Sequence, residues 1–101
     1  LLYERLMQLI PSAIVALNHA VAVAMCEGFE RGLSLIEEAG ESGQLDDYYL
    51  FHAARADLLR RLNRPEEAAE AYRRALTLTT NRVEQQYLRR RLTEVSNAQL
   101  Q

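Results

Sequence analysis

The chain has 101 residues, of which 49% are hydrophobic and 26% charged, and its formal net charge is -2. A chain of this length buries a limited core, which fits one modest soluble domain and excludes a large enzyme. The 17 Leu and 14 Ala residues outnumber the 5 Val and 3 Ile residues, a balance that favours helices over a sheet. The composition therefore predicts an all-α domain.

The chain starts at Leu1 rather than Met, and it contains no secretory leader and no apolar run of about 18 residues. We therefore expect a fragment of a larger soluble protein that has no membrane contact. Cys26 is the one cysteine, which excludes an internal disulfide and agrees with a reducing cytoplasm. The charge is split, because residues 1–50 hold two Arg and eight acids whereas residues 51–101 hold ten Arg and six acids.

The first predicted helix covers residues 1–10, where Leu2 and Leu6 recur at helical spacing. Pro11 closes this helix, because its ring clashes with a continuing helical turn. Ser12 follows as the predicted N-cap of a second helix, which continues to about residue 26.

Gly28 ends the second helix, and a third is predicted over residues 29–39. Two glycines then predict an irregular junction over residues 40–47. Asp46 and Asp47 are placed at the start of the fourth helix, because acidic side chains stabilise a helix N-terminus.

The fourth helix is predicted to continue through Leu62. Pro65 opens a fifth helix, which ends near Thr79. Asn81, with Glu84 three residues later, resembles a capping box and predicts the start of the last helix.

An internal repeat relates the two central helix pairs with a period of 36 residues. Small residues recur at Ala20 and Ala56, at Gly32 and Ala68, and at Ala39 and Ala75, and large apolar ones at Val23 and Leu59 and at Ile36 and Tyr72. Antiparallel helices approach closely where a small side chain of one meets a bulky side chain of the other. The period therefore predicts two similar helix hairpins.

The segment Ala68-x3-Tyr72-x2-Ala75 resembles the A-x3-F-x2-A core of a tetratricopeptide (TPR) hairpin. The chain departs from that motif at Ala16, His19, His52 and Arg55, where large apolar residues are usual, and at Thr80, where the motif has Pro. The resemblance implies a right-handed superhelix of antiparallel hairpins with about six helices. Its expected parts are the last helix of a preceding hairpin (1–10), repeat 1 (12–39), repeat 2 (47–79) and a capping helix (81–98).

In TPR solenoids the first helix of each pair lines a concave groove. The resemblance places on this groove Ile14, Leu17, Asn18, Val21, Met25, Leu50, Asp57, Arg60 and Arg61. Leu17 and Val21 replace the polar residues that clamp a peptide carboxylate, so an amphipathic helix is the better-fitting ligand. The alternative is that the long second helix packs over its neighbours and closes the groove.

The two histidines could in principle serve as catalytic or metal-binding residues. His19 and Cys26 lie seven positions apart on one helix, a rise of about 10 Å, which is too far for a base to activate a nucleophile. His52 has Arg55 one turn later and no acid there to orient its ring. With no metal-binding or phosphate-binding motif in the sequence, we expect no catalytic residue, metal or cofactor, and structural roles for both histidines.

Arg55 and Asp57 are polar residues at positions that should be buried, so each needs a partner. Arg55 is predicted to pair with an acid one helix away or with a loop carbonyl, and ligand binding is the alternative. Basic residues also cluster over 60–64 and 89–91. No aromatic residue is interleaved with these arginines for base stacking. Nearby acids also reduce the positive electrostatic potential of the clusters; they are Glu66, Glu67, Glu70 and Glu94. Direct contact with nucleic acid is therefore disfavoured.

A narrower resemblance covers nearly the whole chain. Residues 11–24 (PSAIVALNHAVAVA), 49–62 (YLFHAARADLLRRL) and 69–76 (AEAYRRAL) resemble the C-terminal extension of a group of bacterial extracytoplasmic-function (ECF) RNA polymerase sigma factors. His19 stands where that group is expected to have Arg. In such proteins, promoter recognition and polymerase binding belong to helical domains on the N-terminal side of the extension.

The resemblance implies a non-catalytic, cytoplasmic regulatory module. Its expected partners are the sigma domains of the same chain and the RNA polymerase core, and its oligomeric state is left open. The first alternative is a free-standing TPR adaptor that binds an amphipathic helix. The second is a hydrolase or small-molecule sensor, which needs a pocket that brings His52, Arg55 and Asp57 together.

Overall fold

A computed structural model describes residues 11–100 of the chain. Five helices and no strand occupy this part, which confirms the all-α prediction for it. The helices are α2 (Pro11–Glu27), α3 (Phe29–Ala39), α4 (Tyr49–Arg61), α5 (Pro65–Leu78) and α6 (Arg82–Leu100). The helix predicted over residues 1–10 lies outside the described residues.

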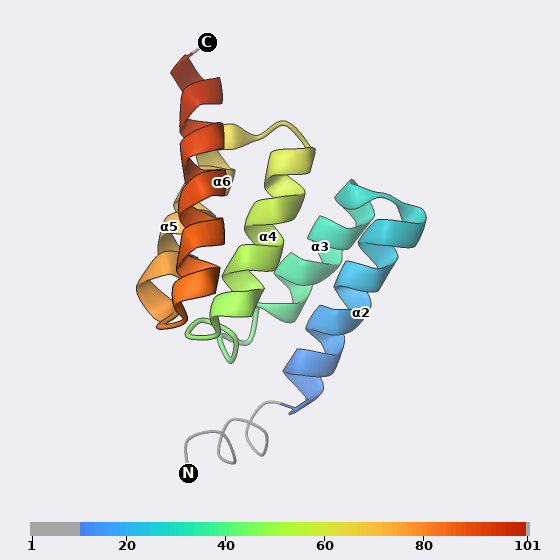
Figure 1. The fold of residues 1–101 in the computed structure, drawn as a ribbon. Helices are drawn as coiled ribbons and strands as arrows, with labels where there is room; N and C mark the ends of the chain where they lie inside the picture. Colours follow the sequence, from blue (N-terminus) through green and yellow to red (C-terminus); the bar gives the residue numbers. More distant parts are fainter. Residues whose placement is uncertain (1–10, 101) are drawn as a thin grey trace.

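Consecutive helices run in opposite directions; α2, α3 and α4 stand in a row, and α6 lies in front of α5 at the end of this row (Figure 1). Each helix packs against the next one along the chain, and α2 also touches α4. Gly28 alone separates α2 from α3, whereas residues 40–48 separate α3 from α4. The irregular junction therefore lies where the two glycines predicted it.

Two predicted helix starts are wrong. Ser12 lies inside α2, which already includes Pro11, so it is not the N-cap. Asp46 and Asp47 lie in a turn, and α4 begins at Tyr49. The tertiary structure explains the second error, because the preceding Leu45 is fully buried in the core and anchors the turn.

The predicted start of the last helix is largely correct. The side-chain oxygen of Asn81 accepts a hydrogen bond of 3.0 Å from the backbone N–H of Glu84, as an N-cap does. In a capping box the Glu84 side chain would also accept a hydrogen bond from the backbone N–H of Asn81. Here that N–H donates instead to Oγ1 of Thr79 at 3.2 Å.

The core follows the 36-residue pattern. Ala20 and Ala56 have no exposed surface, and large side chains such as Ile36 and Tyr72 are fully buried beside such small residues. Gly32 lies so close to α2 that an added Cβ would overlap the Cβ of Ala24. The small residues therefore allow close helix approach, which is the packing that the period predicted.

Candidate functional site

The predicted groove residues of α2 divide by exposure. Leu17 is 3% exposed and belongs to the core, so its placement on an accessible groove is wrong. Ile14 and Val21 are partly buried against the same core. Asn18 is exposed, and Met25 is 59% exposed. The error at Leu17 arises because a helix with apolar residues around most of its circumference does not reveal in sequence which face is buried.

On α4, the predicted groove residues that reach solvent lie near the two ends of the helix. Leu50 is 41% exposed near the start. Arg61 is exposed at the end, and its guanidinium lies 5.1 Å from the centre of the Phe29 ring, within the range of a cation–π contact. We refer to Asn18, Val21, Met25, Leu50 and Arg61 as the α2–α4 surface. Because α2 and α4 run in the same direction, Met25 and Arg61 lie toward one end of this surface and Leu50 lies toward the other (Figure 1).

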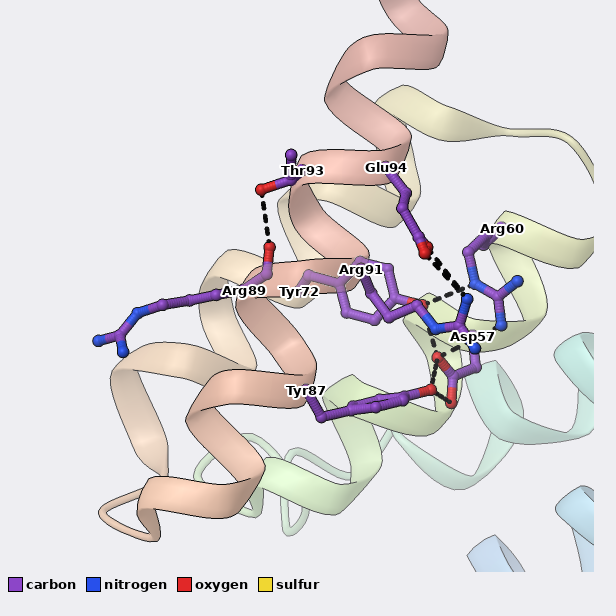
Figure 2. Close-up of polar contacts among 8 residues, drawn as sticks. All are labelled: Asp57, Arg60, Tyr72, Tyr87, Arg89, Arg91, Thr93 and Glu94. Atoms are coloured by element: carbon purple, nitrogen blue, oxygen red, sulfur yellow. Dashed lines mark hydrogen bonds and ion pairs between the residues drawn. The ribbon is translucent and has the colours of Figure 1, made fainter.

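The remaining predicted groove residues of α4 belong to a polar network across three helices (Figure 2). Asp57 accepts a hydrogen bond at 2.5 Å from the hydroxyl of Tyr72 on α5. The hydroxyl of Tyr87 on α6 lies 3.1 and 3.2 Å from the two carboxylate oxygens of Asp57. Arg60 donates from Nε to the Tyr72 hydroxyl at 3.1 Å, and its guanidinium lies 3.9 Å from Asp57.

Arg91 extends this network along α6. Its guanidinium lies 5.4 Å from the centre of the Tyr87 ring and pairs with Glu94 at 3.2 Å. Figure 2 shows the Arg91 side chain directed toward Asp57 and Arg60. Arg91 therefore connects Glu94 to the Tyr87 side of the network.

The network changes the acidity of one member. Burial raises the pKa of the Tyr72 hydroxyl, and the hydrogen bond to Asp57 raises it further. Tyr72 therefore remains a neutral donor at physiological pH, and both oxygens of Asp57 are engaged. A hydrogen-bond network of this kind has a structural role, because it fixes α4, α5 and α6 relative to one another.

Part of this network was not predicted from the sequence. Asp57 was expected to need a partner, but neither the Tyr72 nor the Tyr87 hydroxyl was identified as that partner. The available signal was a tyrosine at the large apolar position of the repeat, because a buried tyrosine hydroxyl requires a hydrogen-bond partner.

His52 and Arg55 lie on the side of α4 that faces α3 and the long junction. Arg55 pairs with Glu37 of α3 at 3.4 Å, which confirms the predicted acid one helix away. Nε2 of His52 lies 2.7 Å from the carbonyl oxygen of Asp46, which can accept a hydrogen but not donate one. Arg74 of α5 binds the same junction through the side chain of Asp47 at 3.2 Å.

These residues border a surface hollow of about 430 Å³. It is lined by His52, Arg55, Glu67, Glu70, Ala71 and Arg74. Asp57 is not among them, because its carboxylate is bound to Tyr72 and Tyr87. The structure therefore does not assemble His52, Arg55 and Asp57 into the one pocket that the hydrolase or sensor hypothesis requires.

His19 is exposed and borders a second hollow, of about 240 Å³, between α2 and α3. The other lining residues are Ala16, Leu35, Glu38 and Ala39. Cys26 is a free, exposed cysteine near the end of α2. Within residues 11–100, no group of three His, Cys, Asp or Glu side chains could hold a metal ion.

The basic clusters are partly neutralised, as predicted. Arg64 makes a bidentate pair with Glu67, with distances of 2.9 and 2.8 Å. Arg89 and Arg90 are exposed, but Arg91 is partly buried and paired with Glu94. The run of three arginines therefore does not form one continuous patch. No helix in the described part of the chain is both long and apolar enough to cross a membrane.

The sequence is 43% identical over 96 residues to an uncharacterized protein of Rhizobium meliloti (strain 1021). The match includes 95% of this chain but spans 22% of the length of that relative. No protein-family model matches the chain, and no solved structure matches it. The comparisons therefore relate this chain to one segment of a considerably longer bacterial protein.

Proposed function

We propose that the chain is a non-catalytic, TPR-like regulatory module of an ECF-type sigma factor in the bacterial cytoplasm. In this proposal it modulates transcription initiation through contacts with the sigma domains of its own chain or with the RNA polymerase core. The proposal combines the sequence resemblance with the row of antiparallel helices.

The repeat arrangement supports the TPR-like part of the proposal. In a right-handed TPR superhelix, α2, α4 and α6 are the first helices of successive pairs, and α3 and α5 are the second. Small residues 36 positions apart lie at the helix contacts, where both Ala20 and Ala56 are fully buried. Such a row leaves the first helices to line one continuous surface for a partner.

The observation that carries the interaction role is the α2–α4 surface. Met25 and Leu50 are 59% and 41% exposed on two neighbouring first helices. Arg61 adds a cation at one end of the same surface. An amphipathic helix with apolar residues on one face and an acid at one end complements this arrangement.

The length of the relative supports a role as one module of a longer protein. Because the matched segment makes up 22% of that protein, a regulatory segment beside separate sigma domains is compatible with the match. The free-standing adaptor is the alternative, and the residues that precede Leu1 distinguish the two by whether they encode sigma-type helices.

The proposal is tested in the longer polypeptide that carries this chain. Removal of residues 1–101 is expected to change promoter-specific transcription in vitro, and unchanged output would contradict a regulatory role. Met25→Glu is expected to reproduce part of the effect, because it places a charge on the apolar partner surface. Val83→Glu is the matched control, since Val83 is a 72% exposed apolar residue on α6 outside the α2–α4 surface.

A further inference from the structure

Exposed polar residues gather on one side of α6. When successive residues are placed about 100° apart, six exposed residues between positions 82 and 97 fall within an arc of about 100°. They are Arg82, Gln86, Arg89, Arg90, Thr93 and Asn97. Each of these side chains carries a hydrogen-bond donor and none is acidic. We call this set the α6 donor face.

Most of these donors are available to a ligand. The Thr93 hydroxyl donates to the backbone carbonyl oxygen of Arg89 at 3.0 Å (Figure 2). None of the three arginines makes an ion pair with another residue of the described part, whereas five other arginines of α4, α5 and α6 each pair with an acid. In Figure 2 the Arg89 side chain extends away from the Asp57 network. The arginines and the two amides therefore remain as free donors.

The two described acids of α6 lie off this face. Glu94 pairs with Arg91 at 3.2 Å. Glu84 is partly buried and lies near Tyr49 of α4, where it adds to the effect of burial in raising the pKa of that tyrosine. Neither acid forms an ion pair with an arginine of the α6 donor face within residues 11–100. The face therefore keeps a positive charge although the whole chain has a net charge of -2.

We propose that the α6 donor face binds an acidic segment of a partner protein. Arg89 and Arg90 lie seven and eight residues after Arg82, a rise of about 10 and about 12 Å. Carboxylates two turns apart on an acidic helix have a similar separation and can reach both ends of this arginine set. Guanidinium groups donate paired, charge-assisted hydrogen bonds to carboxylates, which are stronger than neutral hydrogen bonds. This surface is distinct from the α2–α4 surface.

A nucleic acid is the competing polyanion, and the charge distribution favours the acidic segment. Domains that bind nucleic acid are typically strongly basic, whereas this chain is slightly acidic. A long duplex would continue past α6 and bring its phosphates toward the acidic first half of the chain, where like charges repel. The α6 donor face also has no aromatic residue for base stacking. A short acidic segment meets the arginines without these costs.

Fluorescence anisotropy tests the proposal with the full 101-residue chain. The probe is a labelled, alanine-based helical peptide with Glu residues two turns apart, and the same peptide with Gln in place of Glu is the negative probe. The Glu peptide should bind at low salt and dissociate as salt is added. Arg89→Glu is expected to weaken this binding at least about fivefold, because a charge-assisted contact becomes a repulsive one. Absence of binding by wild type, or equal binding of both peptides, would overturn the proposal.

Arg31→Glu is the matched control, since Arg31 is an exposed arginine of α3 and the substitution changes the net charge by the same amount. It is expected to weaken binding of the Glu peptide by less than about twofold. Equal losses in the two variants would show that net charge alone governs binding, which would contradict a site on α6. Arg89→Glu should keep the circular dichroism of wild type, because the side chain is exposed. Arg82→Glu repeats the test at the other end of the arginine set.

Two further measurements check the choice of partner. Tighter binding of a duplex DNA than of the Glu peptide, with loss of DNA binding in Arg89→Glu, would assign the face to nucleic acid instead. Sedimentation that shows self-association of wild type, lost in Arg89→Glu, would assign it to a second copy. Either result would overturn the proposal. Arg89→Glu leaves the α2–α4 surface unchanged, so these assays and the transcription assay can fail independently.

Discussion

Asp57 shows how one polar residue can connect several elements. It lies on α4, and its carboxylate binds the hydroxyls of Tyr72 on α5 and Tyr87 on α6. An unpaired carboxylate at a helix interface would carry a desolvation cost, whereas hydrogen bonds from neutral donors and the nearby guanidinium of Arg60 offset it. Through this network, the packing position of each of the three helices depends on the other two.

Replacement of Tyr72 by Phe is expected to lower the free energy of unfolding by about 1 to 3 kcal/mol, because Asp57 and Arg60 lose a hydrogen-bond partner in a partly buried site. Urea denaturation followed by circular dichroism measures this change. Tyr48→Phe is the control, since Tyr48 is partly buried and lies outside the network. Equal stability of Tyr72→Phe and wild type would show that the network contributes little.

The same residue predicts a pH dependence. The pKa of Tyr72 is raised above its ordinary value of 10.0, so the folded protein holds this proton more tightly than the unfolded chain does. The resulting stability is present below about pH 10 and is lost as the pH rises further. Wild type should therefore lose more stability than Tyr72→Phe between about pH 9 and about pH 11. Burial and Glu84 also raise the pKa of Tyr49, which should leave a smaller alkaline loss in the variant.

At the level of the helices, local capping determines some ends and tertiary contacts determine others. Asn81 caps α6 through its own side chain. The start of α4 has no side-chain cap, and the preceding turn is fixed instead by the buried Leu45 and by contacts to the Asp46 carbonyl. The start of α6 therefore depends on residues that are neighbours in sequence, whereas the start of α4 depends on residues that are distant in sequence.

Replacement of Asn81 by Ala is expected to destabilise the domain by about 1 kcal/mol, because the first turn of α6 loses its cap. Thr80→Ala is the control, since Thr80 is an exposed neighbour outside the cap. Chemical denaturation measures both variants. A loss confined to Thr80→Ala would contradict the capping role of Asn81.

The whole molecule is a row of helices with opposite charges in its two halves. Residues 1–50 have an excess of acids and residues 51–101 an excess of arginines. The ion pairs Arg55–Glu37 and Arg74–Asp47 join the halves at the long junction. These pairs are partly or largely solvent-exposed, so we expect them to orient the halves more than to stabilise them.

The arrangement of the helices also predicts that some helices open locally more easily than others. Helix α5 packs against both α4 and α6, and the Asp57 network joins all three. The link between α3 and α4 instead includes an exposed ion pair and adjoining surface hollows. Because local opening follows the number and burial of contacts, α2 and α3 should open before α5.

Hydrogen exchange followed by mass spectrometry measures this difference. Amides in the middle of α2 are expected to exchange at least about tenfold faster than those in the middle of α5. Equal protection in the two helices would show that the row opens as one cooperative unit.

Much of the fold follows from the sequence, because its signals are local or periodic. Glycine, proline and apolar spacing predicted helices over 29–39 and from Pro65, and the observed helices are Phe29–Ala39 and Pro65–Leu78. The 36-residue period correctly identified small residues that are buried at helix contacts. These features depend on local chain geometry and on side-chain size, and the residue types in the sequence determine both.

The sequence by itself determined the all-helical class of the described part, most helix limits and the need of Arg55 and Asp57 for partners. The tertiary structure alone decided that Leu17 is buried and that Tyr72 and Tyr87 bind Asp57. The physical reason is that helix formation responds to near neighbours, whereas burial and polar pairing depend on which distant helix occupies the adjacent space.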